Sequence, residues 1–177
     1  MTPEPAQVRA AAEDVEVTRV AEDRWSDVRA VRLAALADSP TAFGSGLHSE
    51  VSFDEGRWRE WVRSAALFVA LANGAPVGMA AGVAGQTSAE RKLVALWVAP
   101  DWRGRSTAER LVGSVLKWAQ SGGVQRVTLW VTDGNTSAQR LYQRFGFEET
   151  GVRKPLPSNP ALTGVEMVLE LGWQPAL

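Results

Sequence analysis

Cysteine is absent from this chain of 177 residues, and histidine occurs only once, at His48. The lack of cysteine excludes disulfides, thiolate metal ligands and a cysteine acyl-enzyme, and a single histidine excludes a multi-histidine metal site. A strong charge of either sign is also missing, because the formal net charge at pH 7 is −1. Nucleic-acid binding through bulk electrostatics needs a clear positive excess. We therefore expect neither a metal nor a nucleic-acid partner.

An unbroken apolar run that could cross a membrane is missing as well. Residues 65–86 carry no charged side chain and are long enough in principle, but Asn73-Gly74 interrupts them and Pro76 follows. Asn-Gly between apolar runs is typical of a β-hairpin, which predicts two antiparallel strands at 67–70 and 77–83. We therefore expect no membrane segment.

Length and composition fit one compact domain, with 45% hydrophobic and 22% charged residues. Residues 1–14 hold prolines, alanines and charges without the apolar stretch of a signal peptide, which predicts a disordered tail. The domain is expected over residues 15–172, with a short C-terminal tail at 173–177. The expected location is the cytoplasm.

The most informative segment begins with an apolar stretch at 93–98, which predicts a strand. A small basic turn follows at 103–108, and apolar residues then recur at helical spacing from Ala108 to Ala119. The free N–H groups at the start of such a helix form a site for a phosphate-type anion. Arg103 and Arg105 would add positive charge there, although a solvated turn with two surface arginines is the plain alternative.

A second informative segment follows the alternating strand predicted at 126–132. Asn135 is a good helix N-cap and Gly146 suits the left-handed position after a helix end. The same helical face carries Ala138, Leu141, Tyr142 and Phe145. Tyr142, the only tyrosine of the chain, should therefore point into the protein. Its side chain could be catalytic there, or it could simply be part of the hydrophobic core.

The remaining patterns predict strands at 15–20, 147–153 and 165–171 and helices at 24–37 and around 58–62. Residues 154–164 carry three prolines and are expected to form a loop.

Together the two segments resemble the GNAT superfamily of N-acetyltransferases, which bind acetyl-coenzyme A (acetyl-CoA). The first block of the family is matched by Val98, Pro100, Trp102, Arg103, Gly104, Arg105 and Ala108, and the second by Asn135, Ala138, Tyr142, Gly146 and Phe147. Ser106 departs from the pattern, because that position is usually glycine. The turn should persist unless the position needs a positive φ.

The resemblance implies an α/β fold in which helices flank a central, mixed and mostly antiparallel sheet. It also implies acetyl transfer from acetyl-CoA to a primary amine of a small molecule or a protein. Without cysteine, a direct ternary-complex mechanism is expected. The residues implied in acetyl-CoA binding are Trp97, Val98, Arg103, Gly104, Arg105, Ser106, Thr107, Ala108 and Asn135, and the implied catalytic residue is Tyr142.

Tyr142 is the implied partner of the leaving sulfur. A free tyrosine has a pKa near ~10 and a thiol near ~8.5, so full proton transfer to the thiolate would be uphill by about 2 kcal/mol. Unless the site lowers the tyrosine pKa, a strong hydrogen bond to the sulfur describes its role better.

The general base is left open by the sequence. Many family members carry a glutamate on the fourth strand, but residues 92–98 contain no carboxylate, and Glu90 precedes them. Glu50, His48, Glu166 and a water chain are the alternatives. The sequence also does not identify the acceptor amine, the acyl-chain preference or whether the chain forms a homodimer. A non-catalytic acyl-CoA sensor or interaction module on the same fold is the alternative function.

Overall fold

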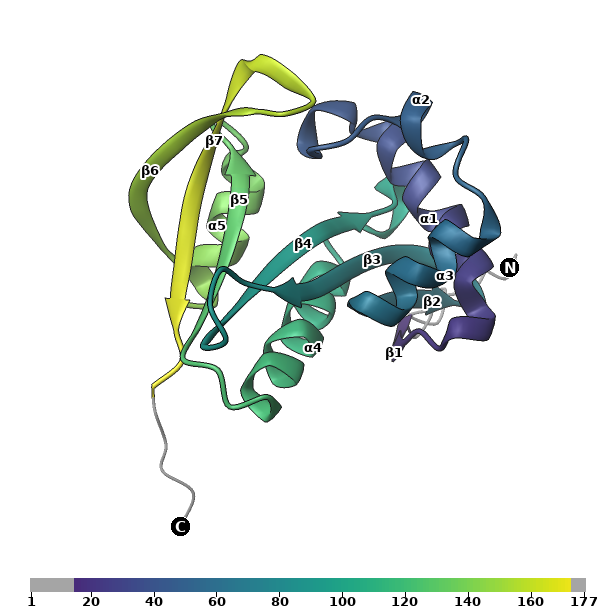
Figure 1. Cartoon of the computed structure of the whole chain (residues 1–177), viewed down its shortest axis with the longest axis horizontal. Helices are drawn as coiled ribbons and strands as arrows, with labels where there is room; N and C mark the ends of the chain where they lie inside the picture. The colour runs from purple at the N-terminus through teal and green to yellow at the C-terminus, as the bar shows by residue number, and fades with distance from the viewer. Residues whose placement is uncertain (1–14, 173–177) are drawn as a thin grey trace, which may run out of the picture.

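The computed structural model describes residues 15–172, and the predicted tails at 1–14 and 173–177 lie outside the described residues. Seven strands form one sheet in the order β1-β2-β3-β4-β5-β7-β6 (Figure 1). The strands are β1 (Val15–Arg19), β2 (Ala66–Ala72), β3 (Ala75–Ala84), β4 (Glu90–Val98), β5 (Arg126–Thr132), β6 (Glu148–Leu156) and β7 (Asn159–Glu170). Every neighbouring pair is antiparallel except β4 and β5, which run parallel. The predicted fold class is confirmed.

Helices cover both faces of the sheet because alternate strand residues face opposite sides. Leu67 and Val69 of β2 pack in one core cluster with α1 (Trp25–Asp38) and α3 (Glu55–Ser64). Phe68 and Ala70 pack in the other with α4 (Thr107–Ser121) and α5 (Thr136–Arg144). The short elements are η1 (Glu22–Arg24), η2 (Pro40–Ala42), α2 (Leu47–Glu50) and η3 (Pro100–Trp102).

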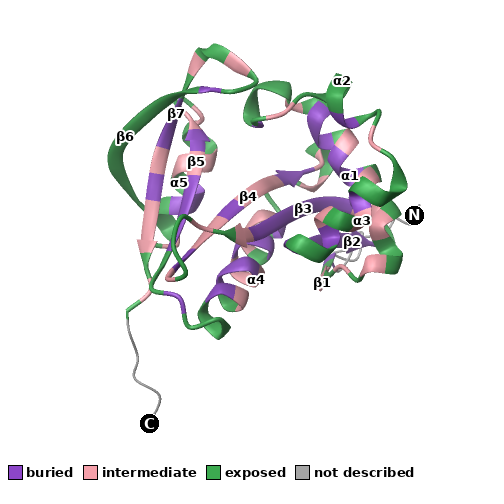
Figure 2. Ribbon diagram, in the orientation of Figure 1, coloured by how far each residue is buried: buried purple, intermediate pink, exposed green. Residues whose placement is uncertain are grey.

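The predicted hairpin at Asn73-Gly74 is present between β2 and β3. Both turn residues have positive φ, 49° and 80°, as a type I′ turn requires. Figure 2 shows that β3 is buried along most of its length, whereas β6, at the edge of the sheet, is exposed.

The prediction of a loop at 154–164 is wrong. β6 continues to Leu156 and β7 begins at Asn159, so the connection is short. Pro155 is tolerated because β6 is an edge strand, and Pro160 lies in the part of β7 that extends beyond its pairing with β5. Prolines in a sequence do not reveal which strands will be edges.

The centre of the sheet divides between β4 and β5. Their parallel pairing joins only three residue pairs, the last of them Lys92 and Thr128, and Figure 1 shows the strands spreading apart toward their carboxyl ends. In the spreading part of β4, Ala95 and Leu96 both lie opposite Ala80, and Ala95 has a φ of 58°. Such a bulge bends a strand and frees its edge for other partners.

Candidate active site

The turn between β4 and α4 depends on two left-handed residues. Gly104 has a φ of 71° and Ser106, the N-cap of α4, has a φ of 60°. The position of Ser106 therefore does need a positive φ, yet the turn forms with a serine there, at a strain of about 1 kcal/mol. The first N–H groups of α4 have no partner within the helix, as at every helix start.

Arg103 does not present a free charge at this turn, contrary to the prediction. Its Nε donates to the Val98 carbonyl oxygen at 2.9 Å, and its guanidinium forms an ion pair with Asp38 at 2.5 Å. Trp97 Nε1 also donates to Asp38, at 2.9 Å. The hydrogen bond from Trp97, with those from Ser39 and Arg103, lowers the pKa of the Asp38 carboxyl from 3.8 to about 2. Asp38 thus ties the end of α1 to β4 and the turn.

Within residues 15–172, no carboxylate forms an ion pair with Arg105. Its guanidinium lies 5.1 Å from the centre of the Trp102 ring, a cation–π contact. The turn therefore carries one unpaired positive charge beside the free N–H groups.

The backbone at the end of β4 faces the gap that opens between β4 and β5 where these two strands spread apart. Ala99 N–H donates to Val77 of β3 at 2.8 Å, so the peptide groups of Val98, one residue earlier, point the opposite way. Among residues 15–172, no strand pairs with that edge beyond Lys92. The Val98 carbonyl is occupied by Arg103, and the Val98 N–H is directed toward the gap.

Tyr142 and Asn135 are held by α5. Asn135 caps the helix, its side-chain oxygen accepting from the Ala138 N–H at 3.2 Å. The Tyr142 side chain is buried, and its ring meets Phe147 edge-on at 5.8 Å. Burial raises the pKa of the Tyr142 hydroxyl well above its ordinary value. The phenol therefore stays protonated and can donate its hydrogen to a hydrogen-bond acceptor.

These elements enclose a cavity of about 470 Å³, which we call the central cleft. Six predicted residues line it, namely Trp97, Val98, Arg103, Gly104, Ala108 and Asn135. Arg105, Ser106 and Thr107 follow Gly104 in the chain but do not line the cavity, and Thr107 is buried. Tyr142 lies next to the lining residue Leu141 but is itself part of the core.

The segment after α1 contributes further lining residues to the central cleft. Ser39, Ala42 and Phe43 close one side of the central cleft. Hydrogen bonds from Thr132 to the Thr41 carbonyl and from Ser158 to the Phe43 carbonyl hold this segment near β5 and the β6–β7 turn.

The comparison with protein families agrees with this geometry. Residues 32–147 match the model of the acetyltransferase (GNAT) family, well over half of the chain. The chain belongs to the GNAT family. A helix long and apolar enough to span a bilayer is not found in residues 15–172, and neither is a group of acidic or histidine side chains suited to a metal ion.

Relatives within the GNAT family match only part of their own length. An uncharacterized N-acetyltransferase of Methanocaldococcus jannaschii is 38% identical over 49% of this chain and 41% of its own. The aminoglycoside N(6′)-acetyltransferase type 1 of Salmonella typhimurium is 32% identical over 48% of this chain and 63% of its own. The ribosomal protein bS18-alanine N-acetyltransferase of Haemophilus ducreyi is 32% identical over 46% of this chain and 59% of its own.

Solved structures of GNAT proteins share the fold over nearly the whole chain. The yncA protein of Salmonella typhimurium, solved with its cofactor acetyl-CoA, has a TM-score of 0.74 at 15% identity, covering 93% of this chain and 98% of its own. A ribosomal-protein-alanine N-acetyltransferase of Brucella melitensis has a TM-score of 0.74 at 19% identity, covering 88% and 99%.

None of the carboxylates considered as a general base lies free in the central cleft. Glu90 is the first residue of β4, not a residue before it, and its buried carboxylate accepts from Thr128 at 2.9 Å. That end of β4 lies about 26 Å from Val98 at the usual rise per residue. Glu166 on β7 accepts from Thr150 at 2.8 Å, and His48 is exposed on α2.

Glu50 is buried in an ion pair with Arg32. The guanidinium donates to both carboxylate oxygens, at 2.7 and 2.9 Å, and Ser45 donates as well. Burial raises the pKa of the Glu50 carboxyl, but the hydrogen bonds from Arg32 and Ser45 outweigh it and leave the pKa below its ordinary value. A carboxylate so occupied is a poor base for an incoming ammonium.

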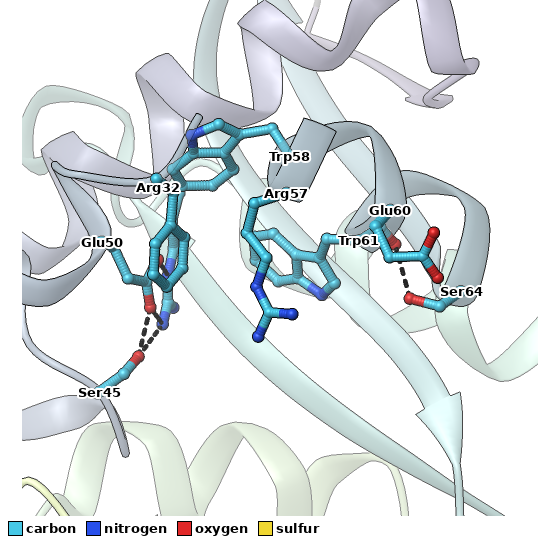
Figure 3. Close-up of a pocket in the computed structure, with 9 residues that line it drawn as sticks. Arg32, Ser45, Glu50, Arg57, Trp58, Glu60, Trp61 and Ser64 are labelled. Carbon is cyan, nitrogen blue, oxygen red and sulfur yellow. Dashed lines mark hydrogen bonds and ion pairs between the residues drawn. The ribbon is translucent and has the colours of Figure 1, made fainter. Parts of the chain in front are cut away.

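This ion pair lines a second cavity of about 380 Å³, which we call the aromatic pocket (Figure 3). Phe53, Trp58 and Trp61 supply its rings. The Arg32 guanidinium is stacked between Phe43, at 4.7 Å, and Trp61, at 5.6 Å. Arg32 lines the aromatic pocket and Phe43 lines the central cleft, so their contact makes the two cavities neighbours.

Proposed function

We propose that this chain transfers the acetyl group of acetyl-CoA to a primary amine. The observation that carries the proposal is the gap between β4 and β5, which exposes the backbone of Val98 and ends at the start of α4. A phosphate group fits this end because N–H groups of a helix start bind anions without a metal. An added Cβ at Gly104 would meet no atom within 4 Å, so the turn leaves room for a ligand against its backbone.

The residues of the central cleft have distinct roles in this proposal. Acetyl-CoA supplies the acetyl group as a thioester, and the amine nitrogen replaces the sulfur on the carbonyl carbon. The Val98 N–H stabilises the negative charge that develops on the carbonyl oxygen. Tyr142 donates a hydrogen bond to the departing thiolate, which agrees with its raised pKa. The side-chain oxygen of Asn135 caps α5, so its amide NH2 group is free and contacts the pantetheine arm.

The ammonium proton leaves through a water chain in this proposal, because the candidate carboxylates are paired or distant. Glu50 is occupied by Arg32, and Glu90 lies at the closed end of the gap. The absence of cysteine supports direct transfer in a ternary complex, since no thiol can hold the acetyl group.

The relatives support two kinds of acceptor, since one is named for an aminoglycoside and another for a ribosomal protein alanine. The test is thiol release from acetyl-CoA over a panel of amines, followed by mass spectrometry of the products. Acetylated amine and intersecting double-reciprocal lines are expected. Parallel lines would contradict direct transfer. Binding of acetyl-CoA without transfer to any amine would identify a sensor instead of an enzyme.

A further inference from the structure

The aromatic pocket contains one guanidinium, that of Arg57, that forms no ion pair with the other residues of the lining. Four ionised side chains line it, and Arg32 and Glu50 neutralise each other in a buried pair. Glu60 forms an ion pair with Arg63 at 2.8 Å. Arg57 pairs with no carboxylate within residues 15–172. The pocket therefore offers a guanidinium to whatever enters it.

Arg57 is directed into this space by the geometry of α3. Arg57 and Trp61 are four residues apart, so they share a helix face, and Figure 3 shows both side chains pointing to the same side. The guanidinium lies 5.5 Å from the centre of the Phe53 ring. The charged group thus stands among rings that can cover the apolar part of a ligand.

We propose that the aromatic pocket binds the acceptor by its carboxylate, so that the substrate class is an amine that also carries a carboxylate, such as an amino acid or a peptide. This inference rests on the proposed acetyl transfer. The stack of Phe43, Arg32 and Trp61 brings the pocket next to the central cleft, where the amine would react. A guanidinium binds a carboxylate through paired, charge-assisted hydrogen bonds.

The charge of the pocket also discriminates among acceptors. An aminoglycoside carries several ammonium groups, which the free Arg57 repels, and the carboxylates that could attract them are already paired. A phosphate monoester carries nearly two negative charges and would be left with one of them uncompensated. A single carboxylate matches the single free guanidinium.

Binding of products tests the pocket without turnover. Calorimetry in the presence of CoA compares N-acetyl-L-phenylalanine with N-acetyl-L-phenylalaninamide, which lacks the carboxylate. We expect the acid to bind at least roughly tenfold more tightly, and Arg57→Gln to remove that preference. Arg59→Gln is the control, because Arg59 lies on the same helix, pairs with Glu55 and does not line the pocket. Equal binding of acid and amide, or no binding of either, would overturn the inference.

Turnover separates this inference from the proposed function. L-Phenylalanine should be acetylated with a KM at least roughly tenfold below that of L-phenylalaninamide, and Arg57→Gln should raise that KM while kcat changes little. Equal rates with the amide or with kanamycin would leave acetyl transfer standing and overturn the carboxylate assignment. If no amine is acetylated, the proposed function fails, and the calorimetric preference alone decides what the pocket binds.

Discussion

The central cleft and the aromatic pocket lie side by side, but their walls are made of different parts of the chain. In the central cleft, the side that we assign to acetyl-CoA consists mainly of backbone: the open edge of β4, the turn at Gly104 and the start of α4. The aromatic pocket is bounded by rings and ionised side chains of α1, α2 and α3. A backbone wall suits a ligand shared by a whole family, whereas a side-chain wall can change its ligand by single substitutions.

The largest effect is expected from Tyr142→Phe, at the central cleft. The ring is kept and the hydroxyl is lost, so kcat should fall ~10²–10⁴-fold while the KM for acetyl-CoA changes little. Steady-state kinetics measure this, and a melting curve controls for folding, which should change little because the ring and its contact with Phe147 are kept. A kcat within about threefold of the wild type would make Tyr142 a core residue only.

A large loss of stability is expected from Glu50→Ala, which leaves Arg32 buried without its partner. The free energy of unfolding should fall by about 3–5 kcal/mol in urea titrations. Glu60→Ala is the matched control, because its pair with Arg63 has side chains 57% and 50% exposed. An exposed pair of this kind contributes less than about 1 kcal/mol. Equal losses of stability in the two variants would contradict the conclusion that the buried pair of Arg32 and Glu50 holds the aromatic pocket together.

Gly104→Val should weaken acetyl-CoA binding roughly 10–100-fold, because the new side chain stands between the phosphate groups and the N–H groups. Gly123→Val is the control: Gly123 also has a positive φ, 65° against 71°, and also has open space around its Cβ. Both variants should lose similar stability, since both place valine in a left-handed conformation. If calorimetry finds the same acetyl-CoA affinity in both variants, the turn is not part of the binding site.

Ser106→Gly should stabilise the protein slightly, by up to about 1 kcal/mol. Glycine relieves the strain of the left-handed φ of 60°, although its greater freedom in the unfolded chain offsets part of the gain. Acetyl-CoA affinity should stay within about twofold, because the backbone N–H remains. A lower melting temperature would show that the serine side chain itself stabilises the turn.

The smallest effect concerns Asp38, which joins the two regions. Its pKa is lowered from 3.8 to about 2, so its pairing stabilises the fold above pH 4 and is lost as the pH falls toward 2. Its side chain is 28% exposed, which limits the contribution to less than about 1 kcal/mol. The stability difference between wild type and Asp38→Asn should therefore shrink between pH 4 and pH 2 in urea titrations. A constant difference would contradict this linkage.

The central cleft could be predicted because backbone geometry restricts which residues it accepts. A positive φ favours glycine and a helix N-cap favours asparagine, so Gly104 and Asn135 could be recognised from the sequence. The ion pair of Arg32 and Glu50 and that of Arg103 and Asp38 join residues 18 and 65 positions apart. Nothing local in the sequence indicates such pairs, and the bulge at Ala95 appears only once β3 and β4 are aligned.

The three residue pairs between β4 and β5 are the only strand pairing between two smaller sheets, β1–β4 and β5–β7, within the described residues. A ligand that lies in the gap touches both and resists their separation. At a hundredfold excess over its Kd it adds about 2.7 kcal/mol to the free energy of unfolding. Proteases cleave opened molecules first, so we expect saturating acetyl-CoA to slow the proteolysis of this chain.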